Sequence, residues 1–174
     1  MKSEVSKKEK QWNVLEQKAD DTVDALGHPI DPKIKLLLVG LWAHAIPTSA
    51  SCEGHLSGER PYPWVRVETP PPRAWGEWEA WKDDERKRKI IYRKNIRAGA
   101  EVLKFLKDFY RTRTSPQENQ LVLSDKNALW GHGELLPKDA DLLPLKQKSL
   151  DRSQAEIQAF AEFLKKKFFE ESKR

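Results

Sequence analysis

Residues 31–56 read DPKIKLLLVGLWAHAIPTSASCEGHL, and this stretch decides the fold class. Asp31 is a helix-capping residue type, and Pro32 behind it suits the first position of a helix. The helix predicted over 32–46 buries residues that recur at helical spacing: Ile34, Leu37, Leu38, Leu41, Trp42 and Ala45. Pro47 prevents the helix from continuing, and small, hydroxyl-bearing residues of a strand and a turn follow. A helix leading directly into a strand predicts an α+β protein.

Two further segments predict strands for the same small sheet. Residues 62–68, YPWVRVE, alternate and end in β-branched residues, whereas residues 120–124 form a short apolar run. Together with residues 48–56 they predict a mixed or antiparallel sheet. The glycine- and proline-containing segment 127–146 is expected to be irregular.

Long amphipathic helices are predicted to pack this sheet. Residues 1–27 form an N-terminal helix, and the last helix begins at Ser153, which makes a capping box with Glu156. Their apolar faces are Trp12, Leu15, Ala19, Val23 and Leu26 in the first helix and Ile157, Phe160, Ala161, Leu164 and Phe168 in the last.

Residues 70–112 combine a tryptophan-rich segment with a long helix from about residue 84. The helix has two apolar stripes, one of Ile91, Ala98, Val102, Phe105, Leu106 and Phe109 and one of Ile96, Leu103 and Tyr110. Two stripes indicate a helix covered on two sides, either within one chain or by a second subunit. A homo-oligomer is therefore compatible with the sequence.

The composition indicates one domain of 174 residues. Hydrophobic residues make up 38% and charged residues 34%, so long solvated helices surround an economical core. The net charge of +5 permits contact with nucleic acid without demanding it.

Cysteine usage and hydropathy exclude several protein classes. The one cysteine excludes an intramolecular disulfide and a multi-cysteine metal framework. No CxxC or HxxxH spacing is present, so no metal ligands are predicted. No apolar leader is recognisable at the start, and no apolar run approaches the roughly 20 residues of a membrane span. We expect a cytoplasmic protein with no membrane partner.

The residues after Pro47 hold the candidate chemistry. In an extended chain Ser49, Ser51, Glu53 and His55 share one face, and Cys52 points with Ala50 toward the core. A turn at Gly54 would instead let Cys52, Glu53 and His55 converge. Strand alternation favours a polar pocket wall over a local cysteine–histidine pair.

A ligand-binding site is the favoured interpretation. Ser and Thr hydroxyls and free N–H groups around Gly54 suit a polar ligand. Tyr62, Trp64 and Arg66 fall on one face of the next strand, where they could stack a base and bind an anion. His132, between two glycines, could complete the pocket. The prediction is a small polar or nucleotide-like ligand, and the residues name no cofactor.

Two other function classes remain open. The first is an enzyme, an RNA-directed transferase or a hydrolase, with His55 and Glu53 as catalytic residues. The second is a structural or protein-interaction module, in which Trp75, Trp78 and Trp81 form either core or a partner surface.

The run TSASCEGH, residues 48–55, resembles the Thr/Ser-Ser-x-Ser-Cys-x-Gly-Arg/His loop of the tRNA wybutosine-synthesising protein 3 family. Ser49, Ser51, Cys52 and Gly54 match that loop, and His55 stands where the family usually has arginine. The resemblance implies a small α/β protein that methylates a modified guanosine in tRNA with S-adenosylmethionine. It covers eight residues, and the CEGH variant followed by PYPWV looks more like a set of uncharacterised bacterial proteins.

Overall fold

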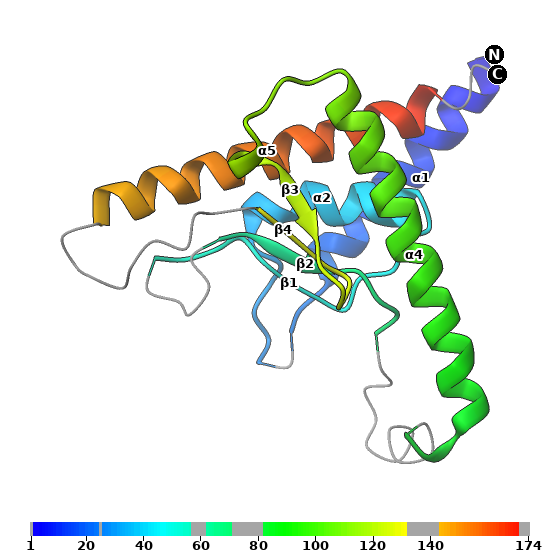
Figure 1. Cartoon of the computed structure of the whole chain (residues 1–174). Coiled ribbons are helices and arrows are strands. Elements are labelled where there is room, and N and C mark those ends of the chain that lie inside the picture. The colour runs from blue at the N-terminus through cyan, green and yellow to red at the C-terminus, as the bar shows by residue number, and fades with distance from the viewer. Residues whose placement is uncertain (1, 25, 57–61, 71–81, 132–142, 171–174) are drawn as a thin grey trace.

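A computed structural model of the chain describes residues 2–24, 26–56, 62–70, 82–131 and 143–170, with side chains from residue 7 onward (Figure 1). The elements in chain order are α1 (Lys2–Asp21), α2 (Pro32–Ala43), β1 (Ala50–Cys52), β2 (Trp64–Arg66), α4 (Glu85–Arg111), the 3₁₀ helix η1 (Gln117–Asn119), β3 (Leu121–Leu123), β4 (Ala128–Gly131) and α5 (Leu143–Glu170). The expected α+β fold class is confirmed.

Within the described residues the sheet has four strands in the order β1-β2-β4-β3, and every neighbouring pair is antiparallel. The prediction that residues 127–146 are irregular was wrong at β4, which lies in the middle of the sheet. A turn at Ser124–Asn127 joins it to β3, with the Ser124 hydroxyl accepting the N–H groups of Lys126 and Ala128. β1 and β2 are shorter than the predicted strands, with three residues each.

The core lies between the sheet and two helices, α2 and α5, which cover one face of it (Figure 1). Its fully buried side chains include Ile34, Leu37 and Leu41 from α2, Val65 and Leu129 from the sheet, and Ile157, Phe160 and Leu164 from α5. The apolar faces predicted for α2 and for the last helix are therefore confirmed. Ala45 is the exception in the α2 face, because it is exposed beyond the end of the helix.

α5 begins at Leu143, ten residues before the predicted capping box. Ser153 and Glu156 are buried in the middle of this helix, so the capping prediction was wrong. Glu156 instead accepts hydrogen bonds from both Nε and Nη2 of Arg113. A capping pattern cannot be told from a buried polar pair without knowing what packs against the helix.

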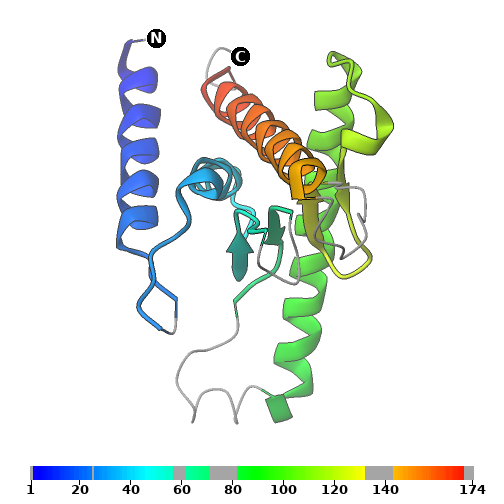
Figure 2. The ribbon, with the colours of Figure 1, turned by 90° about the vertical axis from the view of Figure 1, so that its left-hand side faces the viewer.

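α1 lies against α2, on the side opposite α4 (Figure 2). Trp12 and Ala19 are buried there against Val39 and Phe168. The helix ends at Asp21, whereas the prediction carried it further, and Val23 is 40% and Leu26 81% exposed. Both belong to the turn between α1 and α2.

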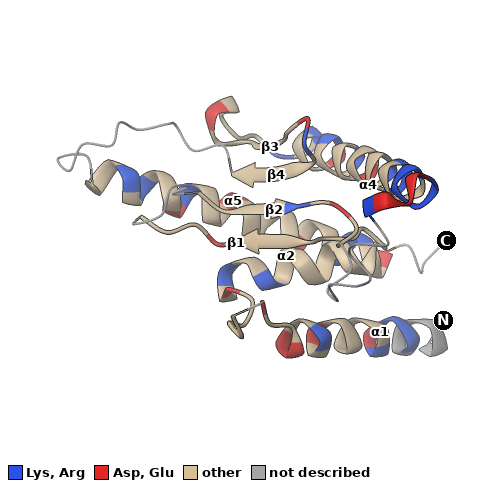
Figure 3. Cartoon of the chain, turned by 90° about the horizontal axis from the view of Figure 1, so that it is seen from below, with Lys and Arg blue, Asp and Glu red and all other residues tan. Residues whose placement is uncertain are grey.

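α4 buries the first of its two predicted stripes more fully than the second. In the described part of the chain, Val102, Leu106 and Phe109 are buried, whereas the side chains of Ile96 and Leu103 are about half exposed. Acidic residues precede and begin α4, and a run of basic residues follows them, in which Lys89 pairs with Glu85 (Figure 3). None of the described helices has the length and apolarity to cross a membrane.

Candidate functional site

The loop after β1 is a tight turn at Gly54. This glycine has a φ of 81°, and a Cβ atom there would lie 2.7 Å from the carbonyl carbon of Tyr62 and 2.8 Å from Leu150 Cδ1. Only glycine fits this combination of a left-handed backbone and close packing. The turn at Gly54 brings the side chains of Cys52 and His55 toward the beginning of α2.

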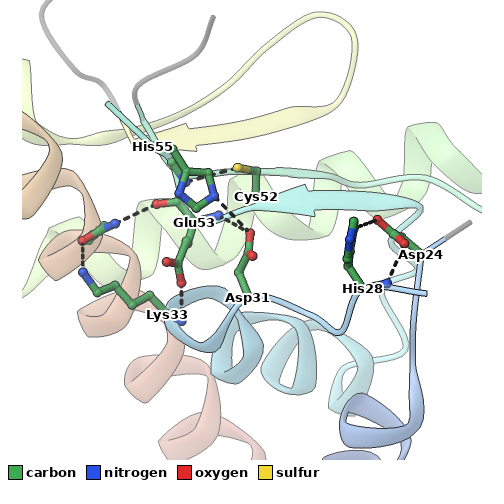
Figure 4. Close-up of polar contacts among 9 residues, drawn as sticks. Asp24, His28, Asp31, Lys33, Cys52, Glu53 and His55 are labelled. Carbon is green, nitrogen blue, oxygen red and sulfur yellow. Dashed lines mark hydrogen bonds and ion pairs between the residues drawn. The ribbon is translucent and has the colours of Figure 1, made fainter. Parts of the chain in front are cut away.

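The carboxylates of Asp31 and Glu53 link this loop to α2 by accepting backbone N–H groups (Figure 4). Oδ2 of Asp31 accepts the N–H of Glu53 at 3.0 Å, and Oε2 of Glu53 accepts the N–H of Lys33 at 2.9 Å. Asp31 makes no side-chain cap to its own helix, and Glu53 supplies one from 20 residues away. The Glu53 carboxylate thus stabilises an otherwise unsatisfied N–H in the first turn of α2.

α5 also holds the loop. The side-chain amide of Gln154 donates to the carbonyl oxygen of Glu53 at 2.9 Å, while its oxygen accepts from Lys33 Nζ at 2.7 Å. Gln154 is only 7% exposed. A buried amide with both ends paired fixes the loop against both α2 and α5.

Asp31, Cys52 and His55 form a cluster of three potential metal-ligating groups. One ligand atom from each lies within 4.8 Å of the others, and Nε2 of His55 is 3.9 Å from Oδ2 of Asp31. The Cys52 sulfur accepts the N–H of Gly54 at 3.3 Å. Burial raises the pKa of the Cys52 thiol, and the negative charges of Asp31 and Glu53 raise it further. Metal-free Cys52 is therefore a thiol at neutral pH.

The predicted orientation of β1 was wrong. Cys52 pairs with Trp64 and Ser51 with the fully buried Val65, and directly opposed residues share a sheet face. Ser51 therefore faces the core side, whereas Ala50 and Cys52 lie on the face of Trp64 and Arg66. The predicted alternation of side chains along β1 was right, but the two faces were interchanged, because the pairing with β2 decides which side chains face the core.

A cavity of about 530 Å³ adjoins the cluster. It lies between β1, the second half of α2 and the segment that joins α1 to α2. Its lining residues are Thr22, Val23, Asp24, His28, Pro29, Ile30, Asp31, Leu38, Trp42, Thr48, Ser49, Ala50 and Ser51. β1 is an edge strand, so the cavity borders polar backbone as well as hydroxyl groups.

Hydrogen bonds fix several polar groups of the cavity wall. Trp42 Nε1 donates to the Thr48 hydroxyl at 2.9 Å, and the Ser49 hydroxyl donates to Glu68 at 2.7 Å. Asp24 accepts the N–H of His28 at 2.9 Å, and this bond is the main cause that lowers the pKa of Asp24. The hydrogen bond from His28 therefore favours the charged form of the Asp24 carboxyl group.

The other residues expected at the site lie elsewhere. Tyr62 packs against Trp130 with ring centroids 5.4 Å apart, and Arg66 pairs with Glu68 at 3.6 Å. Neither these residues nor Trp64 line the cavity. His132, Trp75, Trp78 and Trp81 fall outside the described residues.

The predicted set is thus divided among four places. Ser49 and Ser51 line the cavity, whereas Cys52 and His55 lie in the cluster with Asp31. Glu53 caps α2. Trp64 and Arg66 lie on the sheet face opposite to Val65, and Tyr62 packs against Trp130. The Glu53 carboxylate is directed at Lys33 and not at His55 (Figure 4). The catalytic roles of Glu53 and His55 stay predictions.

Sequence reasoning missed Asp31, Asp24, His28 and Trp42 as site residues. Asp31 was interpreted only as a helix cap, and no local pattern links it to residues 21 positions later. A usable signal was the two-residue gap between Cys52 and His55, the gap of a C-x₂-C zinc half-site. His44 lies apart from this cluster: its Nε2 is 3.0 Å from the carbonyl oxygen of Leu164, and its ring packs at a tilt against Phe105.

Comparisons with known proteins give no match: no family model, no curated protein and no solved structure is similar to this chain. The resemblance of residues 48–55 to the wybutosine-synthesising family therefore stays a prediction. A function for this chain must be inferred from the geometry of the cavity and of the cluster.

Proposed function

We propose that this protein binds a small, hydroxyl-bearing ligand, neutral or positively charged, in the cavity beside β1. The observation that carries the proposal is the position of Ser49 and Ser51 in a cavity of about 530 Å³, a volume in the usual range of small-molecule sites. Hydroxyl groups and an adjoining strand edge offer both donors and acceptors, which suits a ligand rich in hydroxyl or amine groups.

The charges of the cavity favour this class over a phosphate-bearing ligand. Asp24 and Asp31 contribute carboxylates, and none of the described lining residues is a lysine or an arginine. Lys18 lies 4.4 Å from the centre of the Trp42 ring but is not part of the lining. Like charges near a site cost binding energy, so of the nucleotide-like ligands expected from the sequence, nucleosides fit better than nucleotides.

A matched ligand series tests the proposal. Glucosamine, glucose and glucose 6-phosphate share a ring and its hydroxyls but differ in charge, and adenosine and adenosine 5′-monophosphate form a second pair. The readout is the indole N–H resonance of Trp42 in ¹⁵N-labelled protein, because this group lines the cavity and bonds Thr48. We expect the amine or neutral member of a series to shift this resonance and its phosphate to shift it less.

A matched variant locates the effect. Ser51→Ala should weaken the shift, whereas Ser115→Ala, outside the cavity lining, should leave it unchanged. The proposal fails if phosphates shift Trp42 at least as strongly as the amine and neutral members, or if no member of either series shifts it at millimolar concentration. The cytoplasmic location, self-association, the enzyme class and the interaction module suggested by the sequence stay predictions.

A further inference from the structure

We propose that Asp31, Cys52 and His55 bind a divalent transition-metal ion of the zinc class through one oxygen, one sulfur and one nitrogen atom. The three ligands come from separate places in the fold: the residue before α2, the last residue of β1 and the residue after the Gly54 turn. This site is independent of the cavity proposal, although Asp31 borders both.

The spacing of the three groups suits such an ion. Metal–ligand bonds of about 2.0 to 2.3 Å in a tetrahedral site place ligand atoms roughly 3.3 to 3.8 Å apart. His55 Nε2 and Asp31 Oδ2 are already 3.9 Å apart, and all three ligand atoms lie within 4.8 Å of one another. The His55 side chain is 54% exposed, so it is free of the close packing that would oppose a small inward rotation.

The types of ligand atom determine the metal class. Thiolate and imidazole groups favour zinc, cobalt and copper, whereas magnesium and calcium prefer oxygen ligands. Three protein ligands leave a fourth position for water or a substrate atom, as in catalytic zinc sites. Because Asp31 lines the cavity, that position would lie near a ligand bound there.

Backbone groups already orient two of the three ligands. The N–H of Glu53 bonds Oδ2 of Asp31, and the N–H of Gly54 bonds the sulfur of Cys52. Hydrogen bonds of this kind fix the ligand orientation and stabilise thiolate charge in metal sites. These two backbone hydrogen bonds and the Gly54 turn therefore preorganise Asp31 and Cys52 as ligands.

Binding must displace a proton from Cys52. The S–H bond breaks, the metal–sulfur bond forms, and the proton passes to the buffer, with no change in oxidation state. Because each binding event releases this proton, the affinity should increase with pH.

Titration of the tag-free, reduced protein with cobalt(II) tests the site. Since Cys52 is the only cysteine, any thiolate-to-cobalt charge-transfer band in the near ultraviolet must arise from it. We expect one cobalt ion per chain, this band, and visible d–d bands of tetrahedral intensity that zinc abolishes by competition. Cys52→Ser should lose the charge-transfer band.

His55→Ala and Asp31→Asn should each weaken cobalt binding by at least about tenfold, because loss of an outer-shell partner alone costs ten- to a hundredfold. The asparagine introduced by Asp31→Asn would retain an oxygen for the N–H of Glu53, which limits structural damage. Glu162→Gln is the control, because this exposed carboxylate of α5 lies outside both the cluster and the cavity lining, and its loss should leave cobalt binding as in the wild type.

Three outcomes would overturn the proposal: no charge-transfer band at millimolar cobalt, one ion shared by two chains, or equal effects of Glu162→Gln and His55→Ala. Far-ultraviolet circular dichroism of each variant separates loss of binding from loss of fold. Because the readout is the metal spectrum, failure here leaves the Trp42 ligand titration unaffected.

Discussion

Glu53 Oε2 accepts the backbone N–H of Lys33 at 2.9 Å, while the carboxylate of Asp31 accepts the N–H of Glu53 at 3.0 Å. Each carboxylate thus accepts a backbone N–H group from the segment that contains the other acidic residue. This exchange fixes the loop of residues 53–55 to the N-terminus of α2, and it ties the stability of the helix to the position of His55.

The first prediction concerns this cap. Glu53→Ala should lower the free energy of unfolding by about 0.5 to 2 kcal/mol, the usual cost of losing a helix cap. Glu53→Gln should cost less, because its oxygen can still accept the N–H of Lys33. Urea unfolding measures both, with the exposed Glu162→Ala on α5 as control. Equal free energies of unfolding for the Glu53→Ala and Glu162→Ala variants would show that this cap does not stabilise the protein.

Gly54 and Gly27 form a matched pair for a second prediction. Both have positive φ, 81° and 85°, but a Cβ atom at Gly27 meets nothing within 4 Å. Gly27→Ala should therefore cost only the left-handed backbone strain, about 1 to 2 kcal/mol. Gly54→Ala should cost clearly more, because two of its close neighbours, in Tyr62 and Pro63, are backbone atoms that cannot rotate away. Similar thermal unfolding midpoints for the two variants would contradict this packing.

The reactivity of Cys52 provides a third prediction. Burial raises its pKa above the ordinary 9.0, and only the thiolate is nucleophilic. Alkylation by iodoacetamide in metal-free protein should be slow at about pH 7 and increase steadily to about pH 10 as the thiolate fraction rises. Zinc should slow alkylation further, and EDTA should reverse that protection. Fast, pH-independent alkylation would show that the thiol is not protected by burial.

The fourth prediction concerns Arg113 and Glu156. The two charges approach to 2.7 Å, and the Glu156 side chain is 6% exposed. Arg113→Met would leave a buried, unpaired carboxylate and should cost about 2 to 3 kcal/mol, less than for a fully buried pair because Arg113 is 41% exposed.

A double-mutant cycle with Glu156→Gln should recover part of this loss. The exposed pair Lys104 and Glu101, 3.7 Å apart, is the control, and Lys104→Met should change the free energy of unfolding by less than about 0.5 kcal/mol. If Arg113→Met costs no more than this control, the buried pair does not stabilise the fold.

Much of the fold was predictable because helices depend on neighbours in the chain. The apolar faces of α2 and α5 follow from residues three and four apart, and both helices bury them as expected. β4 was missed because Gly131 resembles loop sequence, whereas in the structure a Cβ atom there would lie 2.6 Å from Ser153 Cβ. Glycine is needed at that position for close packing with α5, which no local pattern reveals.

The candidate site was predictable in position but not in arrangement. The sequence indicated the loop around Cys52 and His55, and these two residues do converge with Asp31. It did not indicate the orientation of β1, because a strand of three residues has too little pattern to choose a face. Nor did it indicate Glu53 as a cap, since the bond to Lys33 spans 20 residues.

By itself the sequence determined the start of α2, through Pro32, and which stretches supply the apolar core. These are short-range effects of backbone geometry and periodicity. The tertiary structure alone decided which polar side chains meet. Pairing of β1 with β2 set the face of Cys52, and the close packing of the Gly54 turn against Tyr62 and Leu150 accompanies the approach of His55 to Asp31. Both depend on segments distant in the chain.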